Sequence, residues 1–175
     1  MQNTDERDLV RRAQQRDADA FTELYQRHVD LIFRYVLYRV GDQAAAEDLT
    51  SEVFMRVLES LATYEDRGAP FAAWLYRIAN ARVIDYWRRA SRQNVSLDAG
   101  EVDVPVDLPA RDVIAQRALA QSLQRLTPEQ QEVLMLKFVA DYNTAEIAQL
   151  TGRSEGAVKA LQHRALAALA RLMEP

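Results

Sequence analysis

The sequence predicts an all-α protein in which two small helical domains are joined by a flexible linker. The 175 residues include only five glycines and five prolines, and the long stretches between them suit helices. Hydrophobic residues make up 49% of the chain, which is enough to form cores. The net charge of -4 is concentrated in residues 93–112, where five acids stand against one arginine. We therefore expect domains at 1–92 and 113–175, separated by an acidic linker at 93–112.

Three helical stretches are expected in the first domain. Apolar side chains from Phe21 to Val36 recur at the three- and four-residue spacing of one helix face, and Gly41 ends that stretch. The second stretch runs from about Ala44 to Leu61. The third follows the turn at 67–70, and its apolar stripe consists of Phe71, Trp74, Leu75, Ile78 and Ala79.

The end of the third stretch is basic and aromatic. Residues 76–92, YRIANARVIDYWRRASR, hold five arginines and one aspartate, Asp85, which can pair with an arginine three or four positions along a helix. The rings of Tyr86 and Trp87 can stack on bases while the arginines bind phosphates. Alternatively, the rings belong to the core and the arginines are solvated, and local evidence leaves both interpretations open. A membrane-surface helix is less favoured because Arg82 interrupts the apolar face.

Residues 93–112 read as a linker because they contain Gly100, Pro105 and Pro109 among alternating acids, with no helical period. About 20 residues reach at most roughly 70 Å when extended.

Capping signals mark the helices of the second domain. Residues 127–130, Thr-Pro-Glu-Gln, have the form of a capping box and predict a helix through residues 133–138. Residues 143–146 give a second N-cap, followed by a short helix that ends at Gly152. Ser154 is then expected to cap a last, longer helix.

A short helix, a glycine-containing turn and a longer helix form the pattern of a helix-turn-helix unit. In such units the second helix enters the major groove of DNA. Burial of Val158 and Leu161 would leave these side chains facing outward: Glu155, Lys159, Ala160, His163 and Arg164. The alternative is an ordinary helical hairpin with a charged outer face, but the agreement of caps, turn and spacing favours DNA binding.

Several classes of function are not expected. The chain has no cysteine and only two histidines, so we expect no metal and no cofactor, and His28 is expected to pack at the edge of a helix face. The charged N-terminus does not resemble a signal peptide, and no apolar run reaches the roughly 20 residues of a membrane span. A cytoplasmic location is therefore expected. Neither paired carboxylates with a supporting base nor a glycine-rich phosphate loop suggests an enzyme.

Both halves of the chain, in this order, resemble bacterial RNA polymerase sigma factors of the sigma-70 family, in the extracytoplasmic function (ECF) group. The resemblance covers about residues 15–92 and 113–172. In the first half it depends on AEDLTSEVFMRVLESL and FAAWLYRIANARVIDYWRR, and in the second on LQRLTPEQQEVLMLKF and AEIAQLTGRSEGAVKALQHRALAAL. The second half alone is also similar to response-regulator DNA-binding domains, which lack the EDL-x-x-EVF block.

The resemblance implies a non-enzymatic subunit that binds core RNA polymerase and directs promoter-specific transcription initiation. Region 2, in the first half, would bind the clamp helices of the polymerase and the −10 promoter element. Region 4, in the second half, would bind the polymerase flap and the −35 element. An anti-sigma factor is the inhibitory partner that the family implies. The alternative is a helix-turn-helix regulator that acts without replacing the polymerase specificity subunit.

Carried over by position, the resemblance assigns three sets of residues. Core polymerase binding falls to Asp48, Leu49, Glu52 and Phe54. The −10 element, including a base flipped into a pocket, falls to a loop and helix that carry Asn80, Arg82, Tyr86, Trp87, Arg88 and Arg89. The −35 element falls to Arg153, Ser154, Glu155, Lys159, Ala160, His163 and Arg164. Asn80 stands one position before the asparagine that many relatives carry.

Overall fold

The computed structural model describes residues 5–93 and 110–174, and every regular element within these ranges is a helix, which confirms the predicted fold class. The N-terminal elements are α1 (Glu6–Gln14), α2 (Ala18–Val40), α3 (Gln43–Ser60), the 3-10 turn η1 (Leu61–Thr63) and α4 (Phe71–Arg92). The C-terminal elements are α5 (Ala110–Gln124), α6 (Pro128–Phe138), α7 (Thr144–Thr151) and α8 (Glu155–Met173). None of the described helices is long and apolar enough to cross a membrane.

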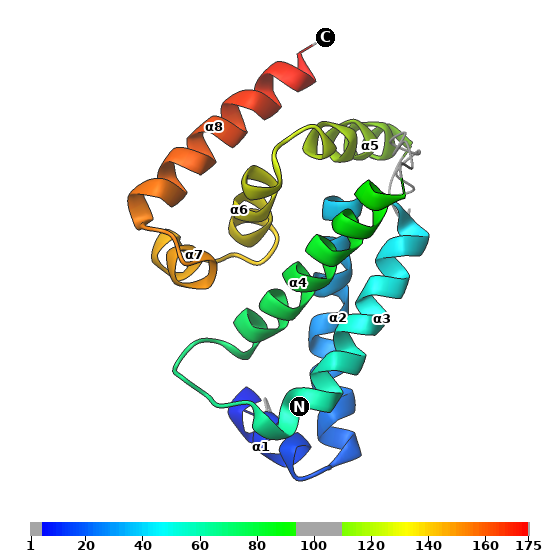
Figure 1. Ribbon diagram of the computed structural model, residues 1–175, viewed down its shortest axis with the longest axis vertical. Coiled ribbons are helices and arrows are strands. Elements are labelled where there is room, and N and C mark those ends of the chain that lie inside the picture. The colour runs from blue at the N-terminus through cyan, green and yellow to red at the C-terminus, as the bar shows by residue number, and fades with distance from the viewer. Residues whose placement is uncertain (1–4, 94–109, 175) are drawn as a thin grey trace.

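The N-terminal domain is a bundle of α2, α3 and α4, with α1 packed against α2 at one end (Figure 1). Gly41 ends α2 in the left-handed conformation at φ 74°, and the Asp42 side chain then caps α3 by accepting from the Ala45 amide. Burial of the apolar faces stabilises the bundle. The fully or nearly fully buried side chains include Leu24, Ile32, Val36, Val53, Val57 and Leu75.

Helix α4 runs without interruption from Phe71 to Arg92. It begins directly after Pro70, whose fixed backbone angle suits a helix start. Asn80 therefore lies in the middle of a helix, and the expectation of a loop at this position is wrong. The nearest loop is residues 61–70, which connects α3 to α4 and is called the 61–70 loop below.

Two helices were not predicted from the sequence. Helix α1 is short and mostly charged, but it buries Leu9, Val10 and Ala13 against the bundle. Helix α5 begins at Ala110, so residues 110–112 are helical although they were assigned to the linker. The rest of the predicted linker, apart from residue 93, lies outside the described residues.

The capping signals of the C-terminal domain are confirmed. Thr127 and Asn143 each form a capping box, and Ser154 accepts from the Ala157 amide at the start of α8. Gly152 adopts a φ of 68° in the turn between α7 and α8, which completes the helix-turn-helix. The core of this domain includes Val133, Leu134, Ile147, Val158 and Ala165.

The two domains are in contact, and helices α5 and α6 pack against α2. The Gln124 side-chain amide donates to the Tyr38 backbone carbonyl. The rings of Tyr76 and Tyr142 meet edge to face, with 5.8 Å between their centroids. Burial raises the pKa of Tyr76 to about 12, so this phenol stays neutral in the contact.

Candidate nucleic-acid interface

One face of α4 is directed toward the C-terminal domain. It carries Arg77, Asn80, Ile84, Trp87 and Arg88, which recur at the three- and four-residue spacing of a single helix stripe. We call this set the α4 stripe. Most of it lines an interdomain cleft of about 700 Å³. The opposite wall of this cleft consists of Pro128, Glu129, Glu132, Leu150, Thr151 and Arg153.

Asn80 holds a buried arginine in place. Its Oδ1 accepts a hydrogen bond of 2.9 Å from Nη1 of Arg39, and Arg39 is only 2% exposed. The same Nη1 donates to the Tyr35 hydroxyl at 2.7 Å. Burial raises the pKa of Tyr35 well above its usual value, so this hydroxyl remains a neutral partner. The Oδ1 atom of Asn80 is thus used to bind a core residue, Arg39.

The residues predicted for the −10 element divide between two sides of α4. Trp87 and Arg88 line the interdomain cleft with Asn80. On the other side, Tyr86 and Arg89 line a pocket of about 360 Å³ against α3, together with residues 48, 49 and 52. Arg82 forms an ion pair with Asp85 at 3.4 Å, and Arg88 forms a looser one at 3.8 Å. The predicted pairing of Asp85 with Arg88 is confirmed.

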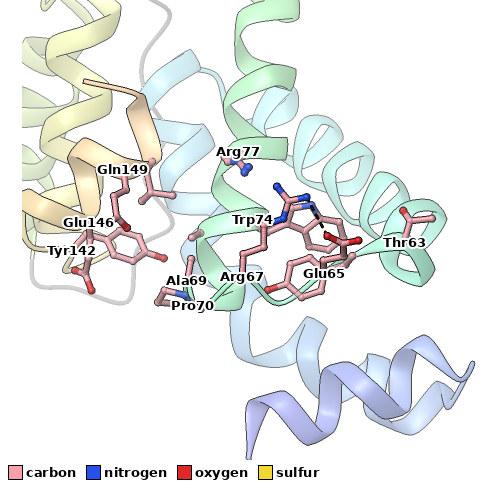
Figure 2. Close-up of a pocket in the computed structure, with 14 residues that line it drawn as sticks. Thr63, Glu65, Arg67, Ala69, Pro70, Trp74, Arg77, Tyr142, Glu146 and Gln149 are labelled. Carbon is pink, nitrogen blue, oxygen red and sulfur yellow. Dashed lines mark hydrogen bonds and ion pairs between the residues drawn. The ribbon is translucent and has the colours of Figure 1, made fainter. Parts of the chain in front are cut away.

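A second cavity, of about 490 Å³, lies where the 61–70 loop meets the start of α4. Figure 2 shows Arg67 and Trp74 on one side of it and Tyr142, Glu146 and Gln149 on the other. The Tyr64 ring lies 4.7 Å from the Trp74 ring and 5.4 Å from the Phe71 ring. We call this the aromatic pocket. The sequence pattern at residues 67–70 predicts only a turn between two helices, although Tyr64 and Trp74 flank it.

The face of α8 agrees with the prediction for a recognition helix. Val158 is fully buried and Leu161 is half-buried. The predicted −35 residues that are exposed are Ser154, Glu155, Lys159, Ala160, His163 and Arg164. Arg153 differs from these, because it is half-buried and forms an ion pair of 3.0 Å with Glu132 of α6.

Helix α3 carries all four residues predicted to bind core polymerase. Asp48 is exposed and Glu52 is half-buried, as expected for surface contacts. Leu49 and Phe54 are buried at 3% and 7% exposure, so in this structure both side chains pack in the bundle. The exposed apolar side chains of α3 are instead Met55 and Leu58, at 63% and 60%. A helix spacing of three and four places them in line with Glu52 and Asp48, and we call these four residues the α3 surface.

His28 is buried and belongs to the packing of α1 on α2. Its Nε2 donates to Oε1 of Glu6 at 2.7 Å, and this hydrogen bond lowers the pKa of Glu6. Within residues 5–93 and 110–174, no group of three or more His, Asp or Glu side chains is arranged to hold a metal ion.

Comparisons with known proteins agree with this arrangement of two regions. The family model "Sigma-70 region 2" matches residues 24–93, and "Sigma-70, region 4" matches residues 116–169. The ECF RNA polymerase sigma factor BldN of Streptomyces coelicolor is 42% identical over 95% of this chain, which spans 65% of that relative. ShbA of Streptomyces griseus and SigL of Mycobacterium tuberculosis, also named ECF sigma factors, are 36% and 31% identical and are covered over 94% and 88% of their lengths.

The chain therefore belongs to the ECF group of the sigma-70 family of RNA polymerase sigma factors, a family of proteins that are not enzymes. Among solved structures, that of CnrH in complex with the cytosolic domain of CnrY has a TM-score of 0.71 at 26% identity and covers 96% of each chain. The sigma factor RpoE of Bartonella quintana, solved with the anti-sigma factor NepR, shares the fold with a TM-score of 0.72 at 19% identity over 87% of this chain and 96% of that one.

Proposed function

We propose that this chain binds core RNA polymerase in the cytoplasm and directs it to promoters with a −10 and a −35 element. The observation that carries the proposal is the order of the two matched regions, each with a face suited to DNA. A helix-turn-helix regulator without a polymerase partner is not favoured, because residues 24–93 match region 2.

For the −10 element, the proposed surface is the α4 stripe together with the aromatic pocket. Trp87 and the Tyr64–Trp74 pair offer ring faces on which unpaired bases can stack. Arg77 and Arg88 supply positive charge for the phosphates of the melted strand. The N-terminal wall of the aromatic pocket, formed by the 61–70 loop and Trp74, is the proposed place for a flipped base, rather than the Asn80 side chain. Arg82, Tyr86 and Arg89 are proposed as flanking contacts on the α3 side.

For the −35 element, the proposed surface is the exposed face of α8. Lys159 and Arg164 suit phosphates and guanine edges, and His163 lies one position before Arg164. Ser154, Glu155 and Ala160 are proposed to lie along the same groove. Arg153 is proposed to orient the start of α8 through Glu132, which it already contacts.

For core polymerase, the proposed contact is the α3 surface. Exposed Met55 and Leu58 offer apolar area, and the Asp48 and Glu52 carboxylates offer charge at its edge. An anti-sigma factor is the proposed inhibitory partner, and it would compete for the same surface.

Reconstitution tests the proposal. The purified chain is mixed with bacterial core RNA polymerase and passed over a sizing column, and genomic DNA fragments are then transcribed in vitro. Co-elution and transcripts that start at discrete promoters are expected. A chain that binds DNA duplexes but never co-elutes with core polymerase would contradict the proposal.

A further inference from the structure

A side chain from α1, near the start of the sequence, binds the backbone of the 61–70 loop. Gln14, the last residue of α1, uses its side-chain amide to donate to the backbone carbonyls of Leu61 and Tyr64, at 3.1 and 2.8 Å. These partners are 47 and 50 residues away along the chain. One half-buried amide group thus fixes two carbonyls, at the beginning and in the middle of the loop.

A second contact joins the same two elements. The Arg7 guanidinium of α1 forms an ion pair of 3.2 Å with Asp66, whose other oxygen accepts from the Gly68 amide at 2.9 Å. Helix α1 is itself held on the bundle by its buried apolar side chains and by the hydrogen bond between His28 and Glu6. It can therefore act as a rigid support for the loop.

The fastened part of the loop is the wall of the aromatic pocket. Tyr64 contributes the carbonyl that Gln14 binds, and its ring packs against Phe71 and Trp74. The direction of the Tyr64 ring therefore depends on where its backbone is held. Helix α1 precedes residues 24–93, the part of the chain that matches region 2, so this support comes from outside the matched segment.

We propose that Gln14 is a positioning residue for recognition of the −10 element: it sets the Tyr64 backbone and thereby the shape of the N-terminal wall of the aromatic pocket. This inference depends on the proposed function, in which that pocket receives a base. Loss of the two hydrogen bonds releases the loop while the α4 stripe and the α8 face stay in place. Base preference at the −10 element should then weaken selectively.

The test compares Gln14→Leu, which has a similar size but no donor, with Gln14→Lys, which keeps a donor. Gln15→Leu is the matched control, because Gln15 is the adjacent residue of the same type and is exposed. Each variant is assembled with core polymerase. Initiation is then measured on two promoter libraries, one randomised over the −10 window and one over the −35 window of a promoter selected with the wild-type holoenzyme.

A base that is read specifically changes the preference by roughly 5- to 150-fold. Gln14→Leu is expected to reduce the preference at one or more −10 positions by about fivefold and to leave the −35 preferences unchanged. Gln14→Lys and Gln15→Leu are expected to keep the wild-type profile. An unchanged −10 profile for Gln14→Leu overturns the inference, and so does an equal loss at both elements, which would indicate a general effect on stability.

Two measurements keep these outcomes separate from other failures. Thermal unfolding checks that each variant is folded at the assay temperature. If Gln14→Leu is not folded, Gln14→Glu, which keeps the side-chain length but replaces the donating amide with an acceptor, is used with the same expected result. A wild-type holoenzyme that shows no base preference in the −10 window contradicts the proposed function, whereas the inference on Gln14 fails only through the variants.

Discussion

Arg39 has the largest side chain among the fully buried residues that the structure describes, and it is charged. Burying a guanidinium costs free energy, and hydrogen bonds from its N–H groups offset part of that cost. Its Nη1 donates to both Tyr35 and Asn80, while its Nε has no hydrogen-bond partner in the described part of the chain. Asn80 is therefore needed to satisfy the core as well as being placed on the α4 stripe.

Replacing Asn80 should lower the stability of the fold. Asn80→Leu removes an acceptor from a buried cation, and we expect the free energy of unfolding to fall by about 1–3 kcal/mol. Asn80→Asp keeps an acceptor and should lose much less. Urea unfolding of the isolated chain measures both. Equal midpoints for wild type and Asn80→Leu would show that the hydrogen bond to Arg39 contributes little.

Arg16 has a left-handed backbone, with φ 67°, in the turn between α1 and α2. A side chain with a Cβ pays a steric cost there that glycine does not. We expect Arg16→Gly to raise the free energy of unfolding by about 0.5–1 kcal/mol, allowing for the entropy that glycine adds to the unfolded chain. Asp141, with φ 58°, is the matched position, and Asp141→Gly should gain less because aspartate tolerates this conformation better. A destabilised Arg16→Gly would contradict the argument.

At the scale of the helix, the two faces of α3 differ. One face packs in the bundle, and the other carries the surface proposed to bind core polymerase. Residues at the buried positions, including Leu49 and Phe54, fill the bundle, and the Phe54 ring packs on Tyr25 at 4.8 Å. The exposed apolar residues Met55 and Leu58 contribute nothing comparable to the core. Mutations on the buried face should therefore lower stability, whereas mutations on the exposed face should weaken binding to core polymerase with little change in stability.

The double variant Met55→Ser/Leu58→Ser should bind core polymerase roughly tenfold or more weakly, as expected when apolar contact residues at an interface are truncated. Its melting temperature should change little. Phe54→Ala should instead lower the free energy of unfolding by about 3–5 kcal/mol, because it leaves a cavity. Titration of labelled chain with core polymerase, together with thermal unfolding, distinguishes the two. A double variant with a lower melting temperature but wild-type affinity for core polymerase would show that Met55 and Leu58 do not contact the polymerase.

At the scale of the whole molecule, part of the surface proposed for the −10 element faces the C-terminal domain across one cleft. Asn80, Trp87 and Arg88 line the same space as Arg153 and the carboxylates Glu129 and Glu132. Elements near positions −10 and −35 lie about two turns of B-DNA apart, or roughly 70 Å. Under the proposed function, the domains must therefore separate before both elements are bound.

A chain held in this closed arrangement should not initiate transcription. The sequence has no cysteine, so Ser91→Cys/Glu129→Cys introduces the only two thiols, both at the cleft. Joining them with a short bismaleimide should abolish promoter-dependent transcription. The same variant treated with N-ethylmaleimide, which blocks the thiols without joining them, should remain active. Normal transcription by the cross-linked chain would show that separation is not required.

The sequence by itself determined the helices whose signals are local. Apolar periodicity predicted α2 and α3, and cap residues predicted α6, α7 and α8, because a helix face and a cap are set by residues within a few positions of each other. The outward direction of Lys159, His163 and Arg164 followed from the burial of Val158 on the same helix. The family was also predicted correctly from the quoted segments.

Only the tertiary structure decided which of the predicted residues reach the surface and what they face. Phe54 and Leu49 are buried because α2 and α4 pack on α3, and nothing in a local pattern fixes which neighbour covers a helix. The pairing of Gln14 with Tyr64 joins residues 50 positions apart, and the aromatic pocket also has walls from both domains. Periodicity and capping report contacts within a helix, whereas these features depend on how separate helices are brought together.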